Sequence, residues 1–181
     1  NALKELGRLD EAVESYQKAL VINSDFSAVH NNLGNTFLLM GRFDEAAQSY
    51  QKALKINPDY PALHNNLGNA LKDLNELEAA LASYDKAISL KPDYADAHNN
   101  RGNVLLSLSL PVKALASYES AISIDANCEY LLGTLLYTKM WLCDWQDVDI
   151  RTAELIQKIQ NEAKASVSFS VLSLIGSLSV Q

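Results

Sequence analysis

The sequence predicts an all-α solenoid, in which antiparallel helix pairs stack one behind another. The first observation is a segment that recurs in tandem without gaps, and its three full copies occupy residues 27–60, 61–94 and 95–128. The second is that apolar residues within each copy fall at helical spacing, three and four positions apart. Self-similarity at such a period is typical of stacked repeats, in which each copy packs only on its neighbours.

Of the positions that carry the same residue in every full copy, four hold glycine, alanine or tyrosine. We number each copy from its first residue, which is Ser27, Pro61 or Ala95. Position 8 is glycine, where two helices must approach closely. Positions 20 and 27 are alanine, and position 24 is a tyrosine that we expect to fill the space between paired helices. These residues are Gly34, Gly68 and Gly102; Ala46, Ala80 and Ala114; Ala53, Ala87 and Ala121; and Tyr50, Tyr84 and Tyr118.

The full copies predict six helices, with proline at position 32 (Pro58 and Pro92) ending the second helix of a pair. The expected helices cover residues 28–41, 44–57, 62–75, 78–91, 96–109 and 112–125. Residues 1–26 are the back part of one more copy, because Asn1 aligns with position 9. They predict a turn at Gly7 and a second helix after it. Since the chain starts inside a first helix, we expect it to be a fragment.

After residue 128 the consensus fades, although its register persists. Residues 129–142 predict a helix, Cys143 and Asp144 a turn, and residues 146–164 a longer helix. We interpret residues 129–164 as a degenerate hairpin that caps the solenoid. Trp145 aligns with position 17, the place of Phe43 and Leu77. The expected inner side of the longer helix carries Val148, Leu155, Ile156 and Ile159.

Residues 165–181 differ from the rest of the chain, since they are apolar, rich in serine and uncharged. Such a segment would be sticky if it were exposed. We therefore expect a linker that packs on a downstream domain beyond Gln181.

Composition excludes several classes of function. The net charge of −7 argues against non-specific binding to nucleic acid. The sequence has neither a signal peptide nor an apolar run long enough to cross a membrane, so no membrane partner is expected. Cys128 and Cys143 lack CxxC spacing, which favours packing or surface positions over a disulfide or a metal site. The sequence thus predicts a cytoplasmic protein.

Histidine recurs at position 4 as His30, His64 and His98, which raises the possibility of a metal site. Neighbouring first helices lie about 8–10 Å apart, whereas zinc needs its nitrogen ligands at about 2 Å. One ion cannot therefore collect these side chains, and we expect them to pack between helices. The chain also lacks a Ser/His/Asp or Cys/His grouping and a phosphate-binding glycine loop. No catalytic residue, cofactor site or metal site is expected in this segment.

Asparagine at positions 5, 6 and 9 is the feature that points to binding. The nine residues are Asn31, Asn32 and Asn35; Asn65, Asn66 and Asn69; and Asn99, Asn100 and Asn103. These positions share one face of the first helix, opposite its packing side. Asparagine is a poor residue inside a helix, so helix stability does not explain the pattern. Hydrogen bonding between neighbouring helices is the alternative explanation, above all for position 9.

An asparagine amide both donates and accepts, so it can pair with a peptide unit without reading the side chain. An extended chain rises about 3.3–3.6 Å per residue, so each repeat would meet roughly three residues of a bound segment. We therefore predict a groove that grips an extended polypeptide by its backbone. Asn32, Asn66 and Asn100 are the principal binding residues, and the other six asparagines are secondary.

The pattern of glycine, alanine, tyrosine and proline within each copy resembles the tetratricopeptide repeat (TPR) family through residue 128. That resemblance implies a right-handed superhelix whose concave surface is lined by the first helices. The third full copy departs from the pattern at Arg101, Pro111 and Ala126. These replace the expected leucine, the expected aromatic residue or leucine, and the expected proline. Pro111 is acceptable in the first turn of a helix. We expect Arg101 to extend past its neighbours, and a binding role is the alternative.

Two kinds of TPR protein offer further comparison. Co-chaperone TPR domains grip a terminal carboxylate with lysine or arginine at positions 2, 5 and 6, which here are alanine, aspartate or asparagine. The better resemblance is to the protein O-GlcNAc transferase family and its bacterial Spindly-like members. This resemblance rests on the sequence NNLGN within the repeats and on the junction motif K-x-x-x-CDW, which here consists of Lys139 and Cys143-Asp144-Trp145.

The transferase resemblance implies that the chain is the substrate-recognition part of a glycosyltransferase. The catalytic domain and its UDP-GlcNAc would then belong to a region beyond Gln181. The alternative is a scaffold of TPR repeats with no enzyme attached. Both interpretations predict protein or peptide partners.

Overall fold

The computed structural model describes residues 8–126 and 131–160, in which every regular element is an α-helix. The chain forms two compact units, the N-terminal unit (residues 1–92) and the C-terminal unit (residues 93–181). Helices of the N-terminal unit are α2 (Leu9–Ile22), α3 (Ser27–Leu39), α4 (Phe43–Ile56), α5 (Pro61–Asp73) and α6 (Leu77–Leu90). Helices of the C-terminal unit are α7 (Ala95–Ser107), α8 (Pro111–Ile124), α9 (Leu131–Trp141) and α10 (Val148–Gln160).

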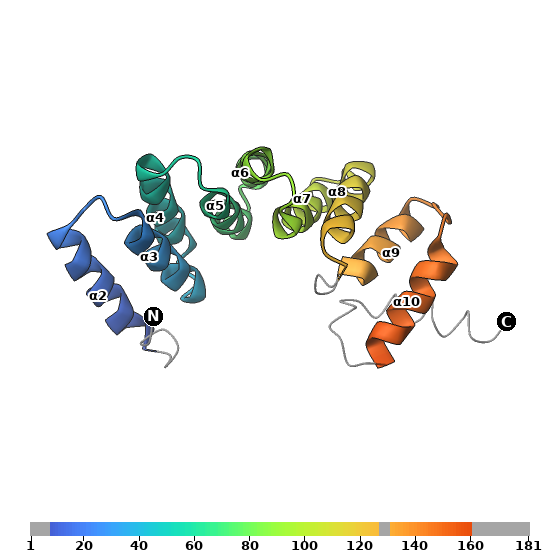
Figure 1. Ribbon diagram of the computed structural model, residues 1–181, viewed down its shortest axis with the longest axis horizontal. Helices are drawn as coiled ribbons and strands as arrows, with labels where there is room; N and C mark the ends of the chain where they lie inside the picture. The colour runs from blue at the N-terminus through green and yellow to red at the C-terminus, as the bar shows by residue number, and fades with distance from the viewer. Residues whose placement is uncertain (1–7, 127–130, 161–181) are drawn as a thin grey trace. The chain divides into compact units, whose positions relative to one another are not determined.

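The repeated copies fold as helix hairpins, as predicted. Helix α3 packs on α4, α5 on α6, and α7 on α8, while α2 packs on α3 and α4 on α5 (Figure 1). Each of the six helices begins one residue before its expected start and ends one or two residues before its expected end. Pro61 and Pro111 stand in the first turns of α5 and α8, where the missing N–H has no partner to lose.

The invariant glycine, alanine and tyrosine residues form the contact between the two helices of each hairpin. Tyr84 is fully buried, and a Cβ atom added at Gly68 would lie 2.6 Å from its ring. The same contact joins Gly34 to Tyr50 and Gly102 to Tyr118. The alanines at positions 20 and 27 are also fully buried in every full copy. The close approach expected at position 8 and the tyrosine expected between the paired helices are both confirmed, and the structure adds that the tyrosine ring lies against the glycine.

The turn inside each hairpin is the same from copy to copy. Gly41, Asn75 and Ser109 all stand at position 15 and have φ values of 72°, 61° and 58°. The N–H of the following residue closes the turn by donating to a carbonyl five positions back, as in the pair Glu76 and Leu71 at 2.9 Å. This is the Schellman arrangement that commonly ends helices in a left-handed residue.

The hairpin α9–α10 keeps that turn although its sequence has diverged. Cys143 occupies the place of Ser109 in the next copy, has φ 53°, and is exposed with a free thiol. Helix α10 begins at Val148, later than the expected residue 146, because Asp147 adds a second left-handed residue (φ 57°) before it. Trp145 therefore precedes the helix and is exposed, unlike the half-buried Phe43 with which it aligns.

The C-terminal hairpin has an apolar core of its own. Helix α9 packs on α10 and on α8. Two of the residues expected on the inner side of α10 are buried there, and Ile122 of α8 packs against the same cluster, which consists of Leu132, Leu136, Val148 and Leu155. Ile156 is half-buried. The predicted turn at Gly7, the side chain of Ile159, Cys128 and the predicted linker 165–181 lie outside the described residues.

Candidate functional site

The nine asparagines lie on α3, α5 and α7, one helix from each full copy. None of them is fully exposed: Asn65 is buried and the other eight are half-buried. This placement limits how many of their polar groups a ligand can reach. The three columns differ in what they contact, so each is described by itself.

Position 9 serves the fold. The tyrosine hydroxyl of each hairpin donates to the asparagine Oδ1 on its partner helix, at 2.7 Å for Tyr50–Asn35 and 2.8 Å for both Tyr84–Asn69 and Tyr118–Asn103. Burial raises the pKa of the Tyr84 phenol well above its ordinary value, with a smaller contribution from Asp73, so the hydroxyl keeps the proton that it donates. The position-9 carbonyls are therefore engaged inside the hairpins.

Positions 5 and 6 connect neighbouring copies. In the N-terminal unit, the Asn66 amide donates to Asn31 Oδ1 at 3.1 Å and more weakly to Asn35 Oδ1 at 3.5 Å. The Asn32 side chain forms no hydrogen bond within residues 8–126 and 131–160. At positions 5 and 6 of this unit, these groups have no hydrogen bond to the described residues: the whole Asn32 side-chain amide, the Asn66 carbonyl oxygen and the Asn31 NH₂. In the C-terminal unit, Asn99 and Asn100 are half-buried on α7.

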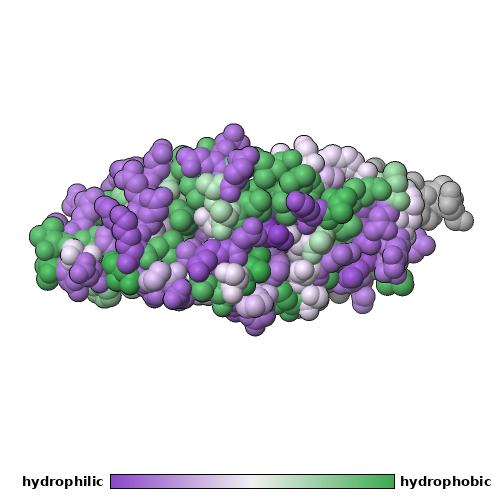
Figure 2. All heavy atoms as spheres, turned by 90° about the horizontal axis from the view of Figure 1, so that it is seen from above, coloured by the Kyte–Doolittle hydropathy of each residue, from purple (hydrophilic) through white to green (hydrophobic). Residues whose placement is uncertain are grey.

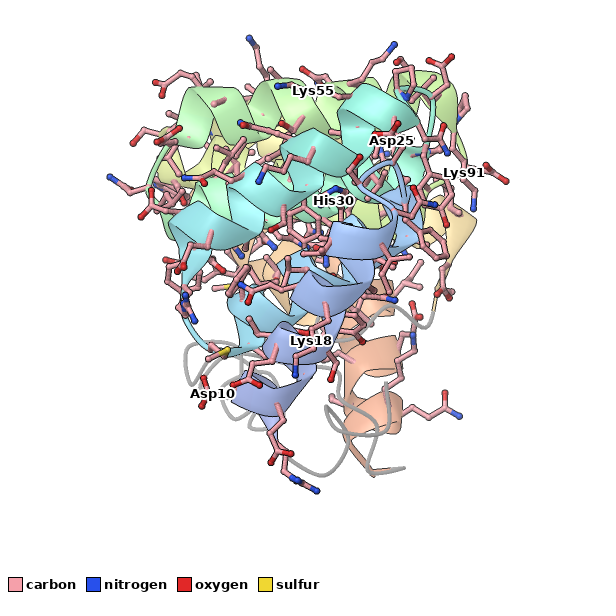
Figure 3. All side chains as sticks on the ribbon, turned by 90° about the vertical axis from the view of Figure 1, so that its left-hand side faces the viewer. Asp10, Lys18, Asp25, His30, Lys55 and Lys91 are labelled. Atoms are coloured by element: carbon pink, nitrogen blue, oxygen red, sulfur yellow. The ribbon has the colours of Figure 1, made fainter. Side chains whose placement is uncertain are left out.

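The position-4 histidines brace the loops between copies. His30 Nε2 lies 3.0 Å from the carbonyl oxygen of Ser24, and His64 Nε2 lies 2.7 Å from that of Pro58. A carbonyl can only accept, so each Nε2 carries the proton. His30 is buried between the helices, as expected for a packing residue, and Figure 3 shows it there. Among the described residues, no three His, Cys, Asp or Glu side chains gather where they could hold a metal ion.

Arg101 turns toward its own hairpin. Its guanidinium donates to the Ser117 hydroxyl of α8 at 2.9 Å, and that hydroxyl donates in turn to the Lys113 carbonyl at 3.1 Å. The arginine is half-buried at a position where the other two copies have buried leucines. Arg101 therefore extends along the packing surface and makes a polar contact inside the unit.

Hydrophobic and hydrophilic residues are interspersed on the face shown in Figure 2, so exposure alone does not mark a site. A cavity of about 560 Å³ in the N-terminal unit is more specific. We call it the loop cavity, because it lies at the two loops that lead into α3 and α5. Its lining includes Asp25, Phe26, Asn31, Ile56, Asn57 and Tyr60. Since the cavity needs two consecutive copies side by side, reading one repeat at a time does not reveal it.

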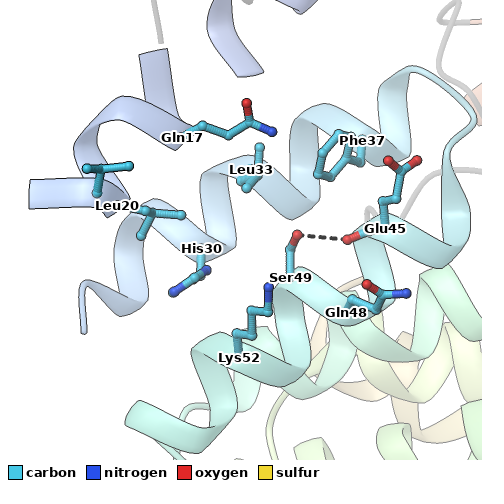
Figure 4. Close-up of a pocket in the computed structure, with 10 residues that line it drawn as sticks. Gln17, Leu20, His30, Leu33, Phe37, Glu45, Gln48, Ser49 and Lys52 are labelled. Atoms are coloured by element: carbon cyan, nitrogen blue, oxygen red, sulfur yellow. Dashed lines mark hydrogen bonds between the residues drawn. The ribbon is translucent and has the colours of Figure 1, made fainter. Parts of the chain in front are cut away.

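A second cavity, of about 380 Å³, lies between α2, α3 and α4 (Figure 4). Its floor includes the buried Leu33 and Phe37 of α3. Ser49 and His30 also line it, but the Ser49 hydroxyl donates to the Glu45 backbone carbonyl at 2.7 Å. This arrangement serves helix packing and does not pair the hydroxyl with the imidazole as a nucleophile needs.

The junction motif holds the α9–α10 turn together. The Lys139 ammonium is buried; it donates to Asp144 Oδ2 at 3.0 Å and to the Gln146 carbonyl at 3.1 Å. The other Asp144 oxygen accepts the Gln146 N–H at 3.1 Å. The lysine hydrogen bond first, and the Gln146 N–H second, hold the pKa of Asp144 below its ordinary value. The spacing of Lys139 and Asp144 is thus explained by folding.

Replacing Asp144 with asparagine is expected to destabilise the C-terminal unit, and more than replacing Lys139 with methionine. Among the described residues, the first change leaves the buried ammonium with the Gln146 carbonyl and, as its remaining charged partner, the more distant Glu119 carboxylate at 3.9 Å. The second change leaves a half-buried carboxylate that water can reach. Because folding lowers the pKa of Asp144, its contribution is present above the unfolded pKa of about 3.9 and is lost as pH falls through the lower folded value.

Urea unfolding followed at about pH 7 and about pH 3 measures both effects. Asp144→Asn should be less stable than the parent at the higher pH and should approach it at the lower. Asp149→Asn, an exposed acid in the first turn of α10, is the control and should change little. Equal stability of the parent and Asp144→Asn at about pH 7 would show that the ion pair does not hold the turn.

The repeated hairpins agree with the comparisons to known proteins. Among the described residues, none of the helices could span a membrane. The chain has no match among curated proteins. MamA is similar over 90% of this chain and 95% of its own, with 24% identity and a TM-score of 0.82. YrrB, a TPR protein with an unusual peptide-binding site, is similar over 84% and 79%, with 21% identity and a TM-score of 0.69.

A peptide-bound structure is also similar to part of the chain. The first TPR of Spaghetti (RPAP3), solved with an HSP90 peptide, matches 65% of this chain and 93% of its own, with 25% identity and a TM-score of 0.63. The family model described as "TPR repeat" matches residues 1–41, 34–74 and 68–109, which together are more than half of the sequence. The chain belongs to the tetratricopeptide repeat family.

Proposed function

We propose that this chain is a protein-binding module that holds an extended polypeptide segment along the asparagines at positions 5 and 6. The observation that carries the proposal is the Asn32 amide, which is half-buried on α3 and makes no hydrogen bond within the described residues. A peptide unit presents one donor and one acceptor, which is what an asparagine amide complements. The Asn31 NH₂ and the Asn66 carbonyl add one donor and one acceptor nearby.

Peptide binding is the role that a related fold supports. The first TPR of Spaghetti (RPAP3) was solved with a bound HSP90 peptide, which supports a peptide or protein partner for this chain too. The charged clamp for a terminal carboxylate is not available here, because positions 2 and 5 carry no lysine or arginine. We therefore infer that the backbone of the partner is recognised, with little preference for its sequence.

A second candidate is that the module recognises substrates for a protein O-GlcNAc transferase-like enzyme. The K-x-x-x-CDW segment at Lys139 to Trp145 favours it. The ion pair between Lys139 and Asp144 explains two residues of that motif by folding alone. The motif is therefore weaker support for a transferase. A scaffold without a catalytic domain fits the comparisons at least as well. The gene sequence after Gln181 separates the two: a transferase needs a nucleotide-sugar-binding domain there.

Changing Asn32 and Asn66 to alanine tests the peptide-binding proposal. A hydrogen bond contributes about 0.5–1.5 kcal/mol net, so the variant should bind an extended peptide about 2–3 kcal/mol more weakly, roughly 30- to 150-fold. The probes are three unrelated Ser/Thr-rich 12-residue peptides, acetylated and amidated so that no terminal charge contributes. Titration by fluorescence anisotropy should show a similar loss for all three, because the peptide backbone is held.

The matched control removes two amides from exposed second-helix positions: Gln48 and Gln51, each changed to alanine. This control should bind as the parent does. Melting curves of both variants should stay near that of the parent, because alanine favours helix and thereby offsets in part the lost Asn31–Asn66 hydrogen bond. Undiminished binding by the asparagine variant, or its unfolding, would show that these asparagines are structural.

A further inference from the structure

The loop cavity has two aromatic rings in its lining. Phe26 and Tyr60 occupy position 34 of consecutive copies and directly precede α3 and α5. The two residues are 49% and 47% exposed, whereas the hairpin tyrosines at position 24 are fully buried. Aromatic residues left half-exposed around a cavity of about 560 Å³ offer their faces to a ligand. A space of this volume is within the usual range of ligand sites, about 300–1,000 Å³.

A carboxylate gives the same cavity a negative charge. Asp25 lies beside Phe26 in the loop between α2 and α3, where Figure 3 labels it. Its side chain accepts a hydrogen bond from the Ser24 hydroxyl at 3.3 Å and has no ion-pair partner among the described residues. Helices α2 and α4 end, and α3 and α5 begin, at the loops around the cavity, so their opposite end charges offset each other. Among the residues that line the cavity, Asp25 is the one with a full charge.

Aromatic faces and a carboxylate together favour one ligand chemistry. A lysine or arginine side chain is attracted to the negative face of an aromatic ring and pairs with a carboxylate. Asp25 repels an acidic side chain. An apolar side chain would give the Asp25 carboxylate no hydrogen-bond or ion-pair partner. The protein's net charge of −7 also favours a basic partner.

The cavity is continuous with the asparagine face. Asn31 lines the cavity, and its Oδ1 accepts the hydrogen bond from Asn66 at 3.1 Å. A segment held on Asn32 and Asn66 therefore passes the cavity mouth. The acid and aromatic pair recurs in the sequence as Asp59-Tyr60 and Asp93-Tyr94, so the motif belongs to the repeat.

We propose that the loop cavity binds an arginine or lysine side chain of the polypeptide held on the asparagine face. The proposal rests on the proposed function and adds a preference to it: the asparagines hold the partner's backbone, and Asp25, Phe26 and Tyr60 select a basic residue. The site makes the module favour basic segments over neutral or acidic ones.

The test uses three acetylated and amidated nine-residue peptides of alanine and serine that differ at the central residue. That residue is arginine, glutamine or leucine. Cation–π contact and an exposed ion pair together should make the arginine peptide bind roughly five- to tenfold more tightly than the glutamine peptide. The variant Asp25→Asn/Phe26→Leu/Tyr60→Leu should bind the two equally, while Glu78→Gln, which removes an exposed charge from α6, should keep the preference.

The outcomes separate this inference from the function on which it rests. Equal binding of the arginine and glutamine peptides, tighter binding of the leucine peptide, or a preference that survives the triple variant would overturn the basic-residue site. Binding of the glutamine peptide by parent and Asn32→Ala/Asn66→Ala protein tests the asparagine face separately. If none of the peptides binds the parent, both proposals are wrong. Melting curves confirm that each variant is folded.

Discussion

Replacing Tyr84 with alanine is expected to lower the free energy of unfolding of the N-terminal unit by about 3–5 kcal/mol. The side chain is fully buried between α5 and α6, packs on the bare backbone of Gly68, and donates a hydrogen bond to Asn69 at 2.8 Å. Its removal leaves a cavity that fixed helices on both sides cannot close. Because each repeat relies on its neighbours, the loss should be felt throughout the unit.

Phenylalanine at the same position separates the ring from the hydroxyl. Tyr84→Phe keeps the packing on Gly68 and removes only the hydrogen bond to Asn69, so a loss of about 1 kcal/mol is expected. Urea unfolding monitored by circular dichroism gives both values. A Tyr84→Ala variant within about 1 kcal/mol of the parent would mean that the hairpin relaxes around the missing ring.

The hairpins could be predicted because each residue that builds them repeats with the chain. Gly68 and Tyr84 stand at positions 8 and 24, which hold glycine and tyrosine in every full copy, and the structure places these two residues in contact in the hairpin of each full copy. The register of the diverged hairpin could also be predicted from the sequence: Cys143 aligns with Gly41 and adopts the same left-handed conformation without being glycine. The later start of α10 could not be predicted, because the left-handed Asp147 has no counterpart in the other turns.

The candidate site is harder to predict from the sequence than the hairpins, because the direction of a side-chain hydrogen bond depends on which side chains meet in the folded protein. Position 9 carries asparagine as regularly as position 6, yet Asn69 accepts from Tyr84 whereas Asn32 forms no side-chain hydrogen bond within the described residues. Sequence periodicity places both on the first helix but does not show which faces the hairpin. The loop cavity was missed for a similar reason: Phe26 and Tyr60 meet around it only when two copies stack.

Changing Gly34, Gly68 and Gly102 together to alanine is expected to cost about 3–9 kcal/mol of stability. In an ordinary helix interior, glycine to alanine is stabilising by about 0.5–1 kcal/mol, so the expected sign is reversed. The added Cβ atoms would lie 2.6, 2.6 and 2.4 Å from the rings of Tyr50, Tyr84 and Tyr118, none of which has room to move. Overpacking of this kind costs about 1–3 kcal/mol at each site.

A second background shows whether the tyrosine ring is the cause. Gly68→Ala is measured alone and in Tyr84→Leu protein, where the nearest ring atoms are gone, by urea unfolding. Alone it should destabilise, and in the Tyr84→Leu background its cost should fall to near zero or become a gain, since only the helix preference of alanine remains. The same cost in both backgrounds would mean that Gly68 is needed for the backbone of α5 itself, and the close approach to Tyr84 would then not explain why glycine stands at position 8.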